Sequence, residues 1–230
     1  MAEIALIVGA GSGLSAALAR LFAKEGMRVA LAARDTQKLE GLCAETGARA
    51  FACDASRPDA VAALFQAVER ELGPPDLVVY NAGQRVPGSI TEVDALAVQQ
   101  SLLNTAYGGF LVAQQAARRM LEKGRGTLLF TGASASVKGY PRSAAFAMGK
   151  FGLRGLAQAL ARELQPMNIH VGHVVIDGGV RRAGDPRAAA RGDDGMLEPD
   201  AVARAYLELH RQHRSAWSWE IELRPWRETF

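Results

Sequence analysis

The first part of the chain contains a short unit that limits what the rest can fold into. An unbroken apolar run at residues 4–8 is followed by residues 9–13, a turn with three glycines in five positions. Apolar side chains then recur at helical spacing, at Leu14, Leu18, Leu21 and Phe22. An apolar run without alternation is typical of a strand buried on both faces, as in a parallel sheet. The unit therefore predicts a strand, a tight turn and a helix that open an α/β fold.

The glycine turn has two interpretations. Some tight turns need glycine simply because it adopts backbone angles that other residues avoid. A glycine-rich turn between a strand and a helix also lets a phosphate approach backbone N–H groups and the helix N-terminus. The position of the turn favours the second interpretation, a dinucleotide-binding turn. The residues expected to contact the cofactor there are Gly9, Gly11, Ser12, Gly13 and Leu14.

Strands and helices are predicted to alternate along nearly the whole chain. Apolar runs predict strands at residues 28–33, 48–52, 76–80, 127–131 and 169–176, with a half-polar strand at 217–224. Helical spacing predicts helices at residues 35–45, 56–72, 93–107, 108–122, 143–165 and 199–211. No repeat or linker divides the chain, so we expect one dinucleotide-binding domain, residues 1–230. Right-handed crossovers then give a doubly wound parallel sheet with helices on both faces, in three α/β/α layers.

Composition excludes several other classes. The 230 residues carry a net charge of +3 without a block of Lys and Arg, so we expect no nucleic-acid partner. Cys43 and Cys53 are too few for a disulfide scaffold and are expected to be reduced. The chain enters its first strand without a signal-like segment, and no apolar run reaches about 18 residues. These features predict a cytoplasmic protein with no membrane span.

Ligands of such sheets bind beyond the carboxyl ends of the strands, so the residues that follow each strand are candidate ligand contacts. Arg34 follows the second strand, where many dinucleotide sites place a carboxylate on the ribose 2′-hydroxyl. An arginine there fits a 2′-phosphate and favours NADP(H) over NAD(H), although a solvated arginine at a helix start is the alternative. Asp54 follows the third strand and suits an adenine amino group or a helix cap. Asn81, Ala82 and Gly83 follow the fourth, where small residues let the chain pass a flat ring.

Together these motifs resemble the short-chain dehydrogenase/reductase family. The resemblance includes the Gly-x-x-x-Gly turn, the Asn-Ala-Gly segment and the sequence that runs from Ser143 to Lys150, and it covers nearly the whole chain. It implies a Rossmann sheet of about seven strands, a nicotinamide dinucleotide cofactor and a homodimer or homotetramer. Asp177-Gly178 stands where the family usually has Pro-Gly, and Gly178 is expected to contact the cofactor.

The same resemblance shows that the catalytic residues are degenerate. The family's site is usually an Asn, a Ser, a Tyr and a Lys, in which the Tyr transfers the proton and the Lys holds the nicotinamide ribose. Lys150 stands at the Lys position, but Phe146 stands at the Tyr position and has no proton to transfer. Ala133 stands at the Ser position with Ser134 beside it. Thr105 stands at the Asn position, and a regular helix rotates its neighbour Asn104 away by about 100°.

Substitutes for the missing proton donor are few. Tyr140, in the loop after the fifth strand, is the best candidate, although packing beside Pro141 is the alternative. Asp177 is a second candidate donor, more typical of a turn or cap. Residues 181–195 lack an apolar period and predict a mobile loop over the strand ends, whose arginines either meet an anion or are solvated. The four histidines lack the spacing of a metal site. The expected catalytic set is therefore Lys150, Ser134 and Tyr140.

Two functions remain open from the sequence. One is an NADP(H)-dependent oxidoreductase that acts on a small carbonyl, alcohol or enone with an atypical proton donor. The other is a dinucleotide-binding sensor, scaffold or partner protein that has lost turnover, which Phe146 favours. A sugar-nucleotide or nucleotide-processing enzyme is a third, weaker interpretation. The substrate is expected to be a small molecule, and its identity lies in loops that carry no readable pattern.

Overall fold

The computed structural model describes residues 2–182 and 184–228 of the chain. Its centre is a seven-stranded sheet in the order β3-β2-β1-β4-β5-β6-β7, and every neighbouring pair is parallel. The strands are β1 Ile4–Val8, β2 Arg28–Ala33, β3 Arg49–Ala52, β4 Leu77–Tyr80, β5 Gly126–Thr131, β6 Ile169–Ile176 and β7 Glu220–Leu223. The strand order reverses between β1 and β4, which confirms the predicted doubly wound Rossmann sheet.

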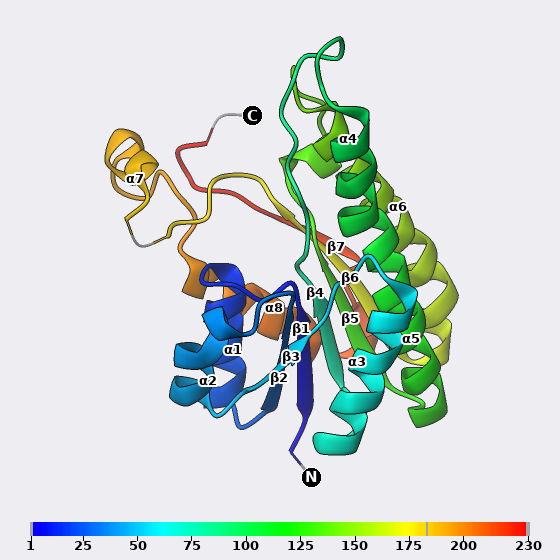
Figure 1. The fold of residues 1–230 in the computed structure, drawn as a ribbon. Coiled ribbons are helices and arrows are strands. Elements are labelled where there is room, and N and C mark those ends of the chain that lie inside the picture. The colour runs from blue at the N-terminus through cyan, green and yellow to red at the C-terminus, as the bar shows by residue number, and fades with distance from the viewer. Residues whose placement is uncertain (1, 183, 229–230) are drawn as a thin grey trace.

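Helices cover both faces of this sheet. They are α1 Leu14–Lys24, α2 Glu40–Thr46, α3 Pro58–Glu71, α4 Ala95–Leu102, α5 Gly108–Lys123, α6 Ala144–Leu164, α7 Pro186–Arg191 and α8 Pro199–Arg211. Figure 1 shows α1, α2 and α8 on one side of the sheet and α3, α5 and α6 on the other. Each face has its own apolar core, because the central strands are buried on both sides and alternate residues point to opposite layers.

Burial along the strands follows their place in the sheet. All residues of β1 and β4 are buried, as their apolar runs predict, and β6 is also buried throughout although it contains His170 and His173. The edge strands β3 and β7 are partly exposed, since each pairs with a neighbour on one side. The half-polar sequence of the last strand therefore reflects an edge position.

Two segments differ from the sequence-based expectations. The stretch 181–195 is not a featureless loop, because α7 forms within it and Asp185 caps that helix by accepting a hydrogen bond from the Arg187 N–H at 3.0 Å. The predicted break between two helices near Tyr107 is also wrong: α4, a π-helical turn at Leu103–Tyr107 and α5 run on without interruption. A π turn adds one residue to a helix and shifts which side chains face a given direction.

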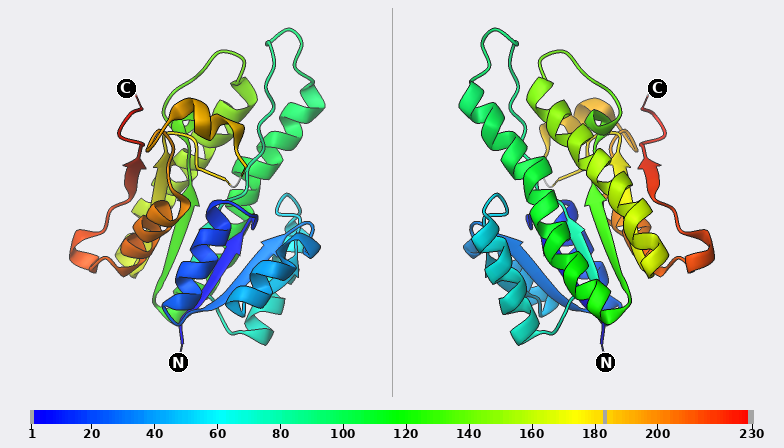
Figure 2. Two further views of the ribbon diagram at one scale, coloured as in Figure 1. Left: turned by 90° about the vertical axis from the view of Figure 1, so that its left-hand side faces the viewer. Right: turned by 90° about the vertical axis from the view of Figure 1, so that its right-hand side faces the viewer.

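The carboxyl ends of the strands form the edge where the long loops gather. Figure 2 shows the segment that follows β4 and leads into α4 extending beyond this edge, beside the start of α6. The segment that follows β6 crosses the same edge from the opposite side before α8 returns to the sheet. These loops enclose the candidate site.

Candidate active site

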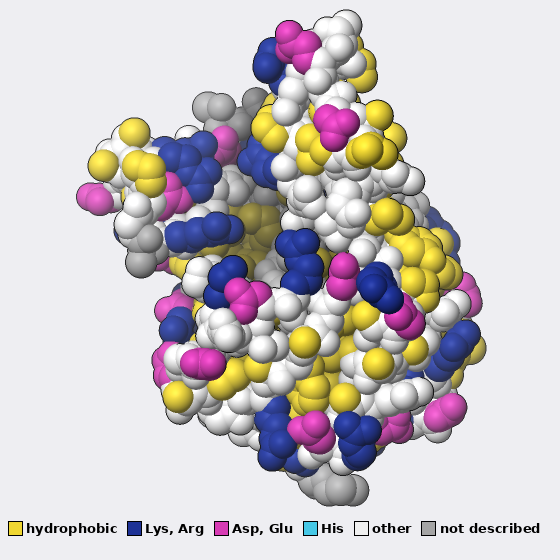
Figure 3. Space-filling view, viewed as in Figure 1, with side chains coloured by type: hydrophobic (Ala, Val, Ile, Leu, Met, Phe, Trp, Pro, Cys, Tyr) yellow, Lys and Arg dark blue, Asp and Glu magenta, His cyan; other side chains and the backbone are white. Residues whose placement is uncertain are grey.

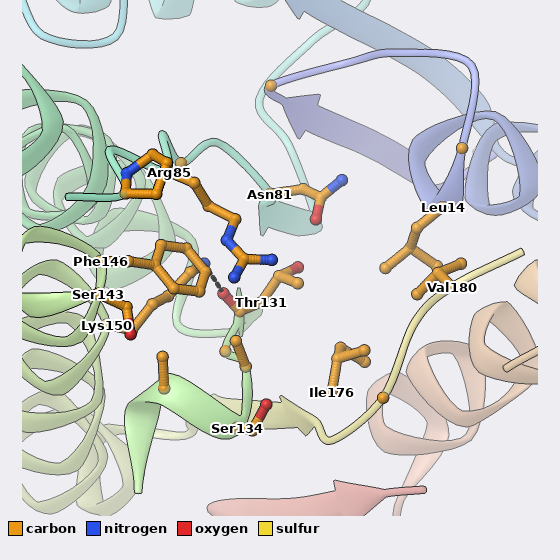
Figure 4. Close-up of a pocket in the computed structure, with 18 of the residues that line it drawn as sticks. Leu14, Asn81, Arg85, Thr131, Ser134, Ser143, Phe146, Lys150, Ile176 and Val180 are labelled. Atoms are coloured by element: carbon orange, nitrogen blue, oxygen red, sulfur yellow. Dashed lines mark hydrogen bonds between the residues drawn. The ribbon is translucent and has the colours of Figure 1, made fainter. Parts of the chain in front are cut away.

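A cavity of about 900 Å³ lies at the carboxyl ends of the central strands. It is lined by the glycine turn, the loops that follow β4, β5 and β6, and the first turns of α6 (Figure 4). A second cavity of about 520 Å³ lies on the other side of the glycine turn, toward β2 and β3. Gly9, Asn81 and Gly83 line both, so the two cavities meet at the switch point of the sheet.

The glycine turn is shaped by close contact on one side and open space on the other. Gly9 has φ +88°, and a Cβ at this position would lie 2.5 Å from the Ala82 N atom, so β1 and β4 leave no room for a side chain. A Cβ on Gly11 would meet no atom within 4 Å. The turn is therefore a cradle whose open side faces the first cavity, at the N-terminus of α1. An anion such as a pyrophosphate fits there, because backbone N–H groups and the helix dipole favour negative charge.

A chain of hydrogen bonds fixes this cradle to β4. The Asn81 Nδ2 atom donates to Ser15 Oγ at 2.7 Å, and the Ser15 hydroxyl donates to the Gly9 carbonyl at 3.1 Å. Ser15 stands where the family resemblance leads one to expect glycine, and the structure gives that departure a function. The serine connects the first turn of α1 to the residue that follows β4.

The second cavity combines basic side chains with carboxylates. Arg34 and Lys38 both line it, and Lys38 forms a 3.0 Å ion pair with Asp35. Asp54 also lines it and accepts hydrogen bonds from the N–H and hydroxyl of Ser56, which lower the pKa of the Asp54 carboxyl. The sequence singled out Arg34 and Asp54 but not Lys38. Lys38 reaches the same cavity from the short helical turn Gln37–Leu39, which follows β2.

Lys150 lines the first cavity at the end opposite to the glycine turn (Figure 4). Its side chain is buried, with 5% of its surface exposed, and Nζ donates to the Thr131 carbonyl at 2.7 Å. Burial lowers the pKa of this ammonium group from 10.5 to about 8. A Cβ on Gly83 would lie 3.4 Å from Lys150 Nζ and 3.7 Å from Thr105 Oγ1, so these two side chains border the same point of the cavity wall.

Two neighbouring residues of the π turn, Thr105 and Asn104, face different sides of the site. The Thr105 hydroxyl accepts a hydrogen bond from the Gln84 N–H at 3.3 Å and is buried near Gly83. Asn104 instead donates from Nδ2 to the Gln84 side chain at 2.6 Å and lines the second cavity. The helix is irregular where a regular one was expected, yet Asn104 still points away from the lysine.

The remaining expected catalytic side chains also reach the first cavity. Phe146 lines it beside Lys150, and the ammonium nitrogen lies 5.9 Å from the centroid of the phenyl ring. Ser134 and Tyr140 line the cavity from the loop after β5, and Tyr140 is 48% exposed. Every residue of the expected catalytic set and of the expected cofactor contacts thus lines one of the two cavities.

The Asp177 side chain lines neither cavity and is held by two cations. Its Oδ2 atom accepts hydrogen bonds from Lys138 Nζ at 3.1 Å and from the Arg224 guanidinium at 2.6 Å. The Asp177 side chain is buried, and these contacts join β6 to the loop after β5 and to the segment after β7. The neighbouring Gly178 lines the first cavity with φ +155°.

The buried histidines His170 and His173 line neither cavity. His173 is fully buried with Nδ1 2.9 Å from Glu220, and burial lowers its pKa to about 4. His170 lies on β6 against Trp217, with parallel rings whose centroids are 4.8 Å apart. Within residues 2–182 and 184–228, no cluster of three or more potential ligands is able to hold a metal ion. Cys43 and Cys53 are both free thiols.

Two joined cavities around a glycine cradle, with cations at one end and a buried lysine at the other, define a dinucleotide-binding α/β protein. The family model for short chain dehydrogenases matches residues 3–182, and the chain belongs to this family. D-threitol dehydrogenase from Mycolicibacterium smegmatis is 32% identical over 166 residues, a match that spans 70% of this chain and 64% of that protein. The chain therefore spans just under two thirds of that relative.

Solved structures are similar over nearly the full length. A short-chain dehydrogenase from Rhodopseudomonas palustris has a TM-score of 0.84 and 36% identity, and the match covers 97% of this chain and 99% of that one. A metagenomic short-chain oxidoreductase solved in complex with NADP has a TM-score of 0.85 and 28% identity, with 97% of both chains covered. In the part of the chain that the structure describes, no helix is long and apolar enough to cross a membrane.

Proposed function

We propose that this chain is an NADP(H)-dependent oxidoreductase that acts on a small carbonyl, alcohol or enone. The observation that carries the proposal is the pair of cavities that meet at the glycine cradle. One cavity is lined by the cations Arg34 and Lys38, and the other by the buried Lys150. A similar structure under 30% identical was solved with NADP, which supports the same cofactor here.

The residues of the site fit such a cofactor. Gly11 and the N-terminus of α1 hold the pyrophosphate, Arg34 and Lys38 bind the 2′-phosphate, and Asn81 and Gly83 border the path between the two ends. When bound, the nicotinamide supplies or accepts a hydride. Lys150 holds the adjoining ribose and adds positive charge close to the reacting carbonyl.

The proton must come from a group other than residue 146. Phe146 has no exchangeable proton, and Asp177 is held between Lys138 and Arg224. Tyr140 lines the same cavity as Lys150 and is half-exposed, so its hydroxyl or a water molecule in the open cavity supplies the proton. Ser134 provides a hydroxyl on the same wall for the substrate oxygen.

Cofactor binding and turnover are tested separately. NADPH and NADH are titrated into the purified protein by nicotinamide fluorescence, and NADPH consumption is then followed with a panel of ketones, aldehydes and enones. We expect tight NADPH binding and turnover of at least one carbonyl class. Gly11→Ala should weaken NADPH binding, because its methyl group enters the open space of the cradle and leaves the packed side of the turn undisturbed.

Phe146 supports one alternative, a dinucleotide-binding protein without turnover. NADPH binding with no consumption across the whole panel would favour that alternative and reject the oxidoreductase as stated. Loss of binding as well would reject both functions.

We further propose that the protein is a homodimer or homotetramer. Several large apolar side chains on α5, α6 and the π turn between α4 and α5 are exposed: Tyr107 by 40%, Phe110 by 43%, Met148 by 54% and Phe151 by 44%. The Tyr107 and Phe110 rings stack on each other with centroids 6.3 Å apart. Light scattering coupled to size exclusion tests the proposal, since a monomer would contradict it and Phe110→Glu should dissociate an oligomer that uses this face.

A further inference from the structure

The lining of the first cavity is strongly positive. Among the described residues that line it, four are basic and none is acidic: Arg85, Arg142, Lys150 and Arg182. Figure 3 shows dark blue Lys and Arg side chains gathered around the hollow between the α7 segment and the α4 segment. A concave surface lined by one sign of charge attracts ligands of the opposite sign.

Two of these cations lie where the proposed cofactor would bind. The Arg182 Nε atom lies 3.4 Å from the position a Cβ on Gly13 would take, so this guanidinium rests on the cradle that receives the pyrophosphate. Lys150 is buried against the Thr131 carbonyl. Arg85 and Arg142 belong to neither place and have no counterpart in the cofactor scheme.

Arg85 projects into the substrate end of the cavity. Its Cζ atom lies 5.1 Å from the centroid of the Phe146 ring, which holds the guanidinium by a cation–π contact. Figure 4 shows the guanidinium between Phe146 and Asn81, directed toward the middle of the cavity. A planar guanidinium seated on an aromatic face keeps its N–H edges free, and those edges match the two oxygens of a carboxylate.

The backbone of Arg142 is held in place on the loop after β5, across from the loop that carries Arg85. The Gly88 N–H donates to the Arg142 carbonyl at 3.0 Å, which ties the loop after β4 to the loop after β5. Arg142 also adopts φ +61°, an uncommon conformation for a residue with a side chain. The connected loops place two basic side chains on the substrate end of one cavity.

Nearby arginines that serve the fold are paired with acids. Arg181 lies 2.9 Å from Glu198, Arg187 lies 2.7 Å from Asp185, and Arg191 lies 3.2 Å from Glu228. The cavity lining offers Arg85 and Arg142 no carboxylate. A ligand that brings its own carboxylate would neutralise this charge with hydrogen bonds that neutral carbonyl compounds do not make.

We propose that the substrate is an oxo acid, or the corresponding hydroxy acid, whose free carboxylate binds Arg85 while Arg142 adds to the attraction. This inference rests on the proposed function and names its substrate class. In reduction, the carbonyl carbon accepts a hydride from NADPH, which is oxidised to NADP⁺. The carbonyl π pair moves to oxygen, which takes a proton from Tyr140 or water, and the carboxylate is unchanged. Phe146 then has a positive role: it seats the arginine that orients the acid.

Paired substrates that differ in a single charge test the inference. Benzoylformate is compared with methyl benzoylformate, and acetoacetate with methyl acetoacetate, by NADPH consumption. We expect kcat/KM at least about 10-fold higher for the acid of the preferred pair, because one charged bidentate contact is lost in the ester. Arg85→Gln should lower kcat/KM for that acid by about 10- to 100-fold, mainly through KM, and change the ester by less than about 3-fold.

Arg118→Gln is the matched control, since this exposed arginine lies on the outer face of α5 and outside both cavities. It should change neither acid nor ester. An ester turned over as well as its acid, or equal losses for both in Arg85→Gln, would overturn the carboxylate assignment while the oxidoreductase function stands.

A binding measurement keeps the inference testable if turnover fails. Benzoylformate and acetoacetate are each titrated calorimetrically into the protein with and without NADPH, at two salt concentrations. Salt-sensitive binding that Arg85→Gln removes and Arg118→Gln retains would support the carboxylate site even for a protein without turnover. Absence of benzoylformate and acetoacetate binding, or binding unchanged in Arg85→Gln, would overturn it.

Discussion

Replacing Lys150 with methionine tests the electrostatic description of the site without any substrate. The ammonium group is buried and donates to the Thr131 carbonyl at 2.7 Å. Burial lowers its pKa from 10.5 to about 8 in the folded protein. Methionine has a similar length and no charge, so it removes the cost of burying a cation while it fills the same space.

The size and direction of the effect follow from the two pKa values. Between pH 8 and pH 10.5, the unfolded chain keeps a proton on Lys150 that the folded protein has lost, so unfolding takes up a proton. The free energy of unfolding therefore rises with pH across this window by about 3 kcal/mol, from about 2.5 pH units at about 1.36 kcal/mol each. Below pH 8 the lysine is charged in both states and the full cost is present.

The measurement is urea unfolding of the cofactor-free protein at pH 7, 8, 9 and 10. We expect Lys150→Met to be more stable than the wild type at pH 7, with a difference that shrinks as the pH rises. Lys24→Met, at an exposed lysine of α1, is the control and should follow the wild-type pH dependence. Parallel curves for the wild type and Lys150→Met would refute the reasoning, because the lysine would then titrate as it does in water.

Three further predictions concern Arg34 in the second cavity, Phe146 beside Lys150 and Gly9 in the glycine turn. Arg34→Ala should weaken NADPH binding by about 10- to 100-fold and leave NADH binding nearly unchanged, because a charged hydrogen bond to the 2′-phosphate is lost. Fluorescence titration measures both affinities. Arg57→Ala is the control and should change neither affinity, since Arg57 pairs with Asp59 outside the cavity. Phe146→Tyr should raise reduction of neutral ketones by restoring a proton donor beside Lys150; unchanged rates at unchanged NADPH affinity would show that the hydroxyl alone is insufficient. Gly9→Ala should lower Tm by several degrees, which corresponds to a loss of about 2 kcal/mol or more in stability, since its Cβ would lie 2.5 Å from the Ala82 N atom. Gly11→Ala should not lower Tm. Equal Tm values for the two variants would contradict the packing argument.

Much of the fold was predictable because its signals are local. The apolar run at residues 4–8 and the glycines after it specify a buried strand and a turn with neighbouring residues alone. Parallel strands also end at one edge, so the residues that follow each strand, such as Arg34, Asp54 and Asn81, were expected to share a site. The structure does place all three along the two cavities.

Other features depended on contacts between distant parts of the chain. Asp177 was a candidate donor from its position after β6, yet its carboxylate binds Lys138 and Arg224, which are 39 and 47 residues away. The π turn that contains Asn104 and Thr105 is a change of hydrogen-bond register that its sequence does not display. Residues 181–195 were expected to be irregular because α7 has no apolar face to reveal it; a capping aspartate and the following proline begin that helix.

The sequence by itself determined the Rossmann sheet, the glycine cradle and the loss of a hydroxyl at position 146, since each is written in residue type and short spacing. Only the tertiary structure placed a guanidinium over the Phe146 ring. Arg85 and Phe146 are 61 positions apart, and they meet where a hydrogen bond from Gly88 to Arg142 joins the loop after β4 to the loop after β5. The positive charge of the first cavity comes from side chains on loops that are far apart in the sequence. These loops meet because the strands before them are neighbours in one parallel sheet.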